Sequence, residues 1–319
     1  MTSAISKKAA KREEKDMNRL IIDTDIGSDI DDAMALALAM KSPELVLEGV
    51  TTVYGNADLR ARMVTKMLQH GGREDVRVYA GLDRPLLGNR EIWMAGHEGK
   101  GLIEEGESLP YEERHAVDFI IDTIMANPGE ITLVPIGPLT NIAACLIREP
   151  RIAHNVKEII LMGGVTRLGR NAAELPVTEH NIVSDPEAAS VVFGSGAPIV
   201  MVGLDVTKQV IITDEHRKRL QETNDPLNAA LARQMDFWFD FIKEKKTFMH
   251  DPLTVSLLID RSLVQTEKMK VTVEYDHRAK TGQTVAVRAE DGNVEVCLEV
   301  DSGRFLAILM NRLTTSTAP

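Results

Sequence analysis

Short apolar runs alternate with helical patterns through the first two thirds of the chain. The first run, at 20–22, is followed by a glycine-containing turn and by a strongly helical stretch at 33–40. This order is typical of a buried strand joined to a helix. Further strands are predicted at 45–53, 76–79, 130–134, 156–162 and 198–202, and further helices at 57–70, 111–126, 139–147 and 185–193. The alternation predicts an α/β fold, with an open, mostly parallel, Rossmann-like sheet and helices on both faces.

The last third of the chain has a different pattern. Residues 214–260 are mostly helical, and a final helix is predicted at 303–313, so the C-terminal part is largely helical. Runs that alternate apolar and polar residues, as antiparallel edge strands do, lie at 270–275, 284–287 and 294–300. Because no linker or repeat divides the chain, we predict a single domain at 19–315 after a mobile tail at 1–18.

Two long stretches, 81–110 and 166–178, show no regular pattern. Loops of this length in a compact domain are usually functional or disordered. Trp93, in the first of them, is expected either to stack on a ligand or to hold the loop in place. The aromatic residues at 237–241 either face a ligand or pack in the core, and the second alternative is the more common one for a helix.

Acidic residues concentrate where the first strand ends. Five carboxylates fall between Asp23 and Asp32. Like charges this close repel each other unless a cation neutralises them, and clusters of carboxylates favour Ca²⁺ or Mg²⁺ over zinc. An acidic turn that caps a helix would explain one or two of the five. The cluster therefore predicts a metal site at the carboxyl edge of the sheet, where α/β folds bind ligands.

Three other predicted strands also end in polar or glycine-rich segments. These segments are Gly55–Asn56, Ile136–Pro138 and Met162–Gly164. The carboxyl ends of parallel strands meet at one rim, so we expect these segments to form a binding site together with the acidic cluster.

Charge and cysteine content restrict the classes of partner. The net charge of −11 argues against nucleic acid and anionic membranes as partners. The two cysteines, Cys145 and Cys297, form no CxxC pair, which favours a reducing, cytoplasmic compartment over a disulfide framework. No apolar stretch reaches the length of a membrane helix, and residues 1–16 lack the apolar core of a secretory signal.

Taken together, these segments resemble the inosine–uridine nucleoside hydrolase family. The matching segments follow the family's order: Asp23–Asp25 with Asp31–Asp32, Gly55–Asn56, His97–Leu102, Gly137–Asn141, Met162–Gly164, Glu179–Asn181 with Asp185–Ala189, and His250–Pro252. They extend from about Leu20 to the last helix. The family's commonest opening is shorter, and this chain has the longer DTDxGSDxDD variant, in which Asp29 could replace one member of the Asp31–Asp32 pair.

The resemblance implies hydrolysis of the N-glycosidic bond of ribonucleosides to ribose and free base, with one bound Ca²⁺. It implies a homodimer or homotetramer. The implied calcium ligands are Asp25, Asp32, Asp251 and the backbone carbonyl of Ile136. The implied ribose contacts are Asp31, Asn56, Asn181 and Asp251, with Glu179 and Asn171 at the 5′ end. His97 either closes over the ribose or is exposed on its loop, and Asn141 is expected to be structural.

Cleavage of a ribosyl C–N bond passes through an oxocarbenium-like transition state. Asp25 is the expected general base, activating a metal-bound water. His250 either protonates the leaving base or is a packed histidine. Contacts to the base are expected from the 81–110 loop and the helices at 225–250.

Three alternatives remain open on the sequence. The Asp23-x-Asp25 pair resembles the start of aspartyl-phosphate phosphatases, in which a carboxylate is the nucleophile. A nucleoside sensor would keep the metal site without turnover. A hydrolase of another N-riboside, such as nicotinamide riboside, would keep the chemistry and change the base.

Overall fold

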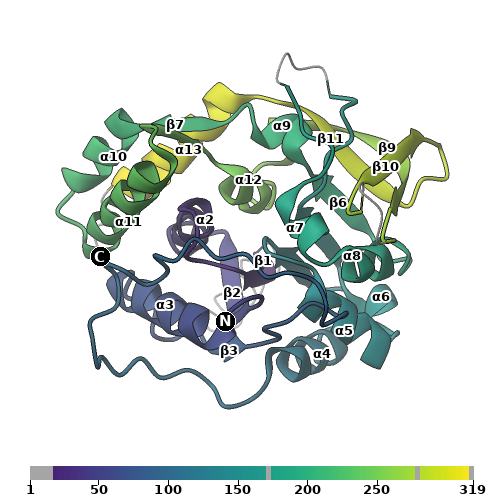
Figure 1. Ribbon diagram of the computed structural model, residues 1–319, viewed down its shortest axis with the longest axis horizontal. Coiled ribbons are helices and arrows are strands. Elements are labelled where there is room, and N and C mark those ends of the chain that lie inside the picture. Colours follow the sequence, from purple (N-terminus) through teal and green to yellow (C-terminus); the bar gives the residue numbers. More distant parts are fainter. Residues whose placement is uncertain (1–16, 170–173, 277–280, 316–319) are drawn as a thin grey trace, which may run out of the picture.

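A nine-stranded sheet organises the computed structural model, which describes residues 17–169, 174–276 and 281–315 (Figure 1). The strand order among the described residues is β10-β9-β11-β6-β5-β4-β1-β2-β3. The strands are β1 (Asn18–Thr24), β2 (Leu45–Thr52), β3 (Val78–Ala80), β4 (Ile131–Pro135), β5 (Glu158–Met162), β6 (Ile199–Val202), β9 (Val264–Val273), β10 (Thr284–Arg288) and β11 (Val294–Val300). The run from β3 to β11 is parallel, which confirms the predicted fold class.

The edge of the sheet differs in part from the prediction. β9 is antiparallel to β10 and to β11, as expected, but β11 pairs with β6 in parallel. β11 therefore extends the parallel sheet, and antiparallel pairing begins only at β9. β9 also starts at Val264, before the predicted 270.

The central strands read as continuous apolar runs because both of their faces are covered. Along β1, Leu20 and Ile22 belong to one buried cluster, whereas Ile21 belongs to the other. This alternation follows the two-residue period of a strand. Buried apolar surface on both faces fixes the register and aligns the carboxyl ends of β1, β4 and β5.

Helices form one layer on each side of the sheet. The layer over Leu20 and Ile22 contains α2 (Asp31–Met40), α3 (Ala57–His70), α9 (Leu204–Thr207), α10 (Asp214–Gln221), α11 (Pro226–Ile242), α12 (His250–Ser256) and α13 (Ser302–Thr314). The layer over Ile21 contains α4 (Ala116–Ala126), α5 (Thr140–Arg148), α6 (Ile152–Asn155), α7 (His180–Ser184) and α8 (Pro186–Phe193). A short helical turn, η1 (Arg261–Leu263), precedes β9.

Some elements depart from the predicted bounds for local reasons. α4 begins at Ala116 rather than at 111, because the His115 side chain caps it by accepting from the backbone N–H of Val117. Within the stretch predicted as mostly helical, the three-residue strand β8 (Lys246–Phe248) pairs antiparallel with β7 (Ile211–Thr213) in a separate two-stranded sheet. β7 and α7 were not predicted.

The long 81–110 stretch contains no helix or strand, as predicted, and is tied down near its start. The Asn141 amide oxygen accepts from the N–H of Leu82 at 2.9 Å, and the Asp185 carboxylate accepts from the N–H of Leu86 at 2.8 Å. Asn141 is thus structural, as expected, and the two side chains fix where this loop leaves the sheet.

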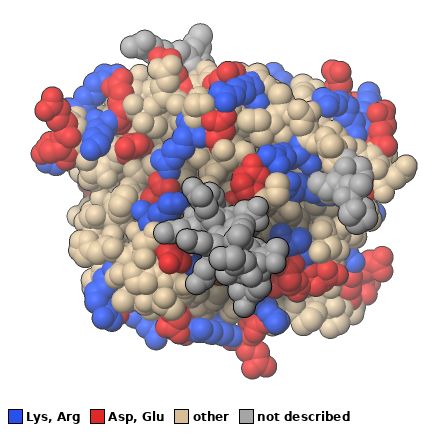
Figure 2. All heavy atoms as spheres, turned by 180° about the vertical axis from the view of Figure 1, so that it is seen from behind, with Lys and Arg blue, Asp and Glu red and all other residues tan. Residues whose placement is uncertain are grey.

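The remaining predictions concern the ends and the surface. Residues 1–16 of the expected tail lie outside the described residues, and β1 already begins at Asn18. No helix among the described residues is both long and apolar enough to cross a membrane. On the face seen in Figure 2, basic and acidic side chains are interspersed, without a continuous basic surface.

Candidate functional site

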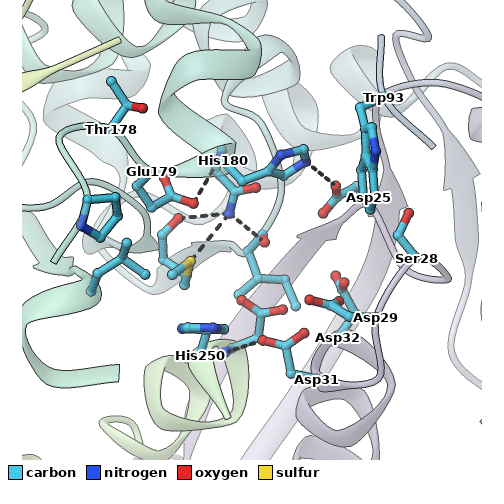
Figure 3. Close-up of a pocket in the computed structure, with 16 residues that line it drawn as sticks. Asp25, Ser28, Asp29, Asp31, Asp32, Trp93, Thr178, Glu179, His180 and His250 are labelled. Atoms are coloured by element: carbon cyan, nitrogen blue, oxygen red, sulfur yellow. Dashed lines mark hydrogen bonds and ion pairs between the residues drawn. The ribbon is translucent and has the colours of Figure 1, made fainter. Parts of the chain in front are cut away.

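A cavity of about 530 Å³ opens at the carboxyl ends of β1, β4 and β5. Its lining residues are Asp25, Ser28, Asp29, Asp31, Asp32, Trp93, Ile136, Met162, Pro176, Thr178, Glu179, His180, Asn181, Leu204, His250 and Asp251. Figure 3 shows Asp29, Asp31 and Asp32 grouped at one end of the cavity, Glu179 at the opposite side, and His180 pointing toward Asp25. The rim of the sheet therefore forms a pocket, as the sequence predicted.

The acidic side of the pocket comes from two distant segments. Asp25, Asp29, Asp31 and Asp32 follow β1, and Asp251 lies in the first turn of α12. The backbone N–H of Asp251 donates to the Asp31 carboxylate at 3.3 Å, so α12 is joined directly to the start of α2. The Thr24 hydroxyl donates to Asp32.

Burial and mutual repulsion both disfavour the charged forms of these carboxylates. Burial raises the pKa of Asp31, Asp32 and Asp251 well above the usual range, and neighbouring carboxylates raise it further. Burial also raises the pKa of Asp25, against the opposing effect of Arg60 and His180. A bound cation would reverse this cost by stabilising the ionised forms.

The donor set fits a hard divalent cation. Carboxylate oxygens of Asp29, Asp31 and Asp32 lie within 4.8 Å of one another. None of the residues lining this pocket is lysine or arginine. Oxygen-only donors of this kind suit Ca²⁺ or Mg²⁺. All four residues that the resemblance implies as metal ligands, Asp25, Asp32, Ile136 and Asp251, line the same cavity.

One buried arginine beneath the cavity holds the acidic segment by its backbone. Arg60 on α3 is fully buried, and its guanidinium donates to the carbonyls of Asp25, of Ile26 at 2.8 Å and of Tyr54 at 2.7 Å. Gly137 packs on the other side, where an added Cβ would lie 2.8 Å from the Asp25 carboxylate. These contacts fix the backbone and carboxylate of Asp25.

The opposite side of the pocket is built on α7. Asn181 donates from its amide to the carbonyls of Ile136 at 2.9 Å and of Met162 at 3.2 Å, which joins α7 to the ends of β4 and β5. Glu179 caps α7 by accepting from the N–H groups of Asn181 and Ile182. Its second oxygen also accepts from the N–H of Gly164 at 2.9 Å. The glycine-rich end of β5 is therefore used to position Glu179.

Not every residue predicted for the site lies in the pocket. Asn56 is exposed at the start of α3, where its side chain accepts from the N–H of Leu59 at 2.9 Å, and it does not line the cavity. Its amide is used to cap a helix. His97 does not line the cavity either, and its Nε2 is 2.7 Å from the carbonyl of Ser28. Asn171 lies outside the described residues.

His250 faces the cavity as a half-buried, neutral ring. Its Nδ1 lies 2.7 Å from the Thr207 hydroxyl. Burial lowers the pKa of His250 to about 4. At pH 7 the ring is therefore uncharged, and it can offer a hydrogen bond to a leaving base but not the proton of an imidazolium.

The sequence interpretation missed His180. This residue lies between Glu179 and Asn181, and its Nε2 is 4.0 Å from the Asp25 carboxylate. Its ring meets Trp93 edge-on, with ring centroids 5.5 Å apart. Trp93 thus lines the cavity instead of only pinning its loop. The sequence carried no signal for it, since neighbouring residues of a helix project in directions about 100° apart.

Metal-free protein is expected to gain stability when the pH falls from 8 to 6. Burial raises the pKa of Asp23 to about 7, and Asp31, Asp32 and Asp251 are shifted in the same direction. A carboxyl group with a higher pKa in the folded state binds protons preferentially there, so protonation through this range favours folding. Thermal melts in EDTA at pH 8, 7 and 6 measure the effect.

The matched control is Asp23→Asn. Asp23 accepts from Thr51 and from Asn141 at 2.8 Å through one oxygen, and its other oxygen has no partner among the described residues. The variant should show a smaller rise in melting temperature than the wild type. A melting temperature that falls between pH 8 and pH 6 would contradict the expectation.

Comparisons with known proteins agree with this geometry. Residues 20–307 match the family model described as inosine-uridine preferring nucleoside hydrolase. The chain is 36% identical over 312 residues to the inosine-uridine preferring nucleoside hydrolase of Crithidia fasciculata, covering 92% of this chain and 97% of that protein. It is 35% identical over 303 residues to the pyrimidine-specific ribonucleoside hydrolase RihB of Escherichia coli O157:H7, covering 91% and 95%.

A solved structure shows the same likeness in three dimensions. The purine-preferring ribonucleoside hydrolase from Gardnerella vaginalis superimposes with a TM-score of 0.83 at 33% identity, covering 93% of this chain and 98% of that one. The match over nearly the whole chain favours a nucleoside hydrolase over the aspartyl-phosphate phosphatase alternative. The chain belongs to the inosine-uridine preferring nucleoside hydrolase family and is an enzyme that hydrolyses the N-glycosidic bond of ribonucleosides.

Proposed function

We propose that this hydrolase depends on Ca²⁺ and that Asp25 activates the attacking water. The observation that carries the proposal is that Asp25, Asp31, Asp32 and Asp251 share one pocket with Glu179 and Asn181. When bound, the Ca²⁺ would orient the sugar hydroxyls and a water and lower the pKa of that water. Asp25, Asp32, Asp251 and the Ile136 carbonyl would hold it.

The other roles in the reaction are proposed for side chains of the pocket. Asp25 is fixed by Arg60 and Gly137, so its carboxylate can take a proton from water in a defined direction. Asp31 and Asp251 would accept hydrogen bonds from the ribose hydroxyls, and Asn181 and Glu179 would position the ring and its 5′ end. The surrounding carboxylates favour the positive charge that develops on the sugar.

His250 and the aromatic residues would act on the base. Thr207 can donate to His250 Nδ1, in which case Nε2 carries the ring proton and can hydrogen-bond the departing base. Trp93 and His180 provide ring surfaces at the mouth of the same cavity. His97 would act indirectly, through its contact with Ser28.

The test is a panel of ribosides assayed before and after removal of divalent cations. Inosine, uridine, cytidine, adenosine and nicotinamide riboside should be compared in EDTA, and after EDTA removal with Ca²⁺ or Mg²⁺ added back. We expect release of free base that is lost in EDTA and restored best by Ca²⁺. Undiminished turnover in EDTA would overturn the metal dependence. The panel also distinguishes purine, pyrimidine and nicotinamide specificity.

We expect ribosides to be strongly preferred over 2′-deoxyribosides. Loss of the 2′-hydroxyl would leave buried carboxylates of Asp31 or Asp251 without a partner, and such losses commonly lower kcat/KM by about 10²-fold or more. The measurement is kcat/KM on uridine and on 2′-deoxyuridine under identical conditions. Equal kcat/KM values would mean that the pocket does not hydrogen-bond the 2′-hydroxyl.

The oligomeric state is likewise proposed from the family resemblance, as a homodimer or homotetramer. Light scattering on the purified chain tests it.

A further inference from the structure

Asp29 is a carboxylate of the pocket that the mechanism above does not use. It lies in the segment between β1 and α2 and is partly buried. One of its oxygens lies within 4.8 Å of ligand oxygens on Asp31 and Asp32. Figure 3 shows these three side chains grouped at the same end of the cavity.

The segment that carries Asp29 is held from both sides. The Ser28 hydroxyl donates to the Glu98 carboxylate at 2.9 Å, and His97 Nε2 donates to the Ser28 carbonyl at 2.7 Å. Arg60 binds the carbonyls of Asp25 and Ile26 from beneath. Asp29 is therefore positioned by the fold and is not a free surface acid.

No arginine or lysine of the described residues forms an ion pair with Asp29. Three carboxylates this close repel one another, and the repulsion is relieved only by protonation or by a cation. Ca²⁺ accepts six to eight oxygen ligands. The four ligands proposed above, together with one water and two ribose hydroxyls, make seven, which leaves room for one further oxygen at the upper limit of about eight.

Building on the proposed metal-dependent function, we propose that Asp29 is an additional ligand of the Ca²⁺ ion. The longer opening segment then has a purpose, because it brings one more oxygen to the cation. An extra carboxylate raises affinity for Ca²⁺, and it favours Ca²⁺ over Mg²⁺, which is restricted to octahedral coordination. His97 and Glu98 act as positioning residues, since they hold Ser28 next to this ligand.

The experiment titrates Ca²⁺ into EDTA-treated, dialysed full-length protein by isothermal titration calorimetry. Asp29→Ala should weaken Ca²⁺ binding by about tenfold or more, with a smaller effect on Mg²⁺. Asp29→Asn should lie between Ala and wild type, because an amide oxygen can still bind Ca²⁺. Glu91→Gln, which removes an exposed charge from the loop near the pocket, should stay within about twofold of wild type.

Melting in EDTA shows whether the variants fold. Both Asp29 variants should melt at or above the wild-type temperature, since each removes a repelling charge. Wild-type Ca²⁺ affinity in Asp29→Ala would overturn this inference alone. If the KM for inosine rose in that variant, Asp29 would instead be a contact to the sugar. A wild-type protein that binds no Ca²⁺ would overturn the proposed metal dependence as well.

Discussion

Asp25→Asn is expected to lower kcat on inosine and uridine by about 10²- to 10⁴-fold, the usual loss for a general base. Asp25 is almost fully buried, and its carboxylate has little room on the side of Gly137. Gly137 approaches its carboxylate so closely that an added Cβ would lie 2.8 Å from it. Asparagine has the same shape, so this variant removes the basic group without remodelling the pocket.

The measurement is kcat and KM on both nucleosides at saturating Ca²⁺. Calorimetric titration with Ca²⁺ and a thermal melt accompany it, so that loss of the base is distinguished from loss of metal or fold. Asp75→Asn, an exposed acid paired with Arg73, is the matched control and should keep wild-type kcat. An Asp25→Asn enzyme with a kcat near that of the wild type would remove Asp25 from the role of base.

The sequence predicted the parts of the fold that depend on strong periodic signals. β1, β4, β5 and β6 are buried on both faces, so their apolar runs stand out and their carboxyl ends could be placed on one rim. The acidic segment and α12 meet there, as the family resemblance implied. Asp251 lies in the first turn of α12, and its N–H donates to the Asp31 carboxylate at the start of α2.

Features that depend on three-dimensional partners were missed. β7 and β8 have three residues each, too few to show a period of two. His180 was hidden between two residues that had already been given roles. Asn56 was placed on the rim, but the direction of its side chain is set by the N–H of Leu59, and the cap points it out of the pocket.

Arg60 is the clearest example of a residue that the sequence alone could not interpret. In the amphipathic helix α3, Arg60 has the helical spacing of Ala57, Val64 and Met67 and so falls on the apolar face, but the pattern does not say what a charged residue there would bind. Arg60 is fully buried, and two of its carbonyl partners, Asp25 and Ile26, lie before α2 and β2 in the chain. Only the folded chain shows that the buried guanidinium binds the carbonyls of the acidic segment.

Arg60→Met is therefore expected to destabilise the protein by about 3–5 kcal/mol, as removal of one partner from a buried charged network does. Methionine fills part of the volume but leaves the carbonyls of Asp25, Ile26 and Tyr54 without donors. It also removes the positive charge that lowers the pKa of Asp25 and Asp32 against the effect of their burial. Urea denaturation in EDTA measures the free energy of unfolding.

Two further variants distinguish the loss of the positive charge from the loss of the hydrogen bonds to the carbonyls. Arg62→Met, on the same helix, loses one bond to the Glu107 carbonyl at 3.1 Å and should cost about 1 kcal/mol or less. Arg60→Lys keeps the charge, but a single ammonium cannot reproduce the planar fork that serves three carbonyls, so it should fall between wild type and Arg60→Met. If Arg60→Met unfolded within about 1 kcal/mol of the wild type, the acidic segment would be held by the strands and by Glu98, and Arg60 would be only a filler of space.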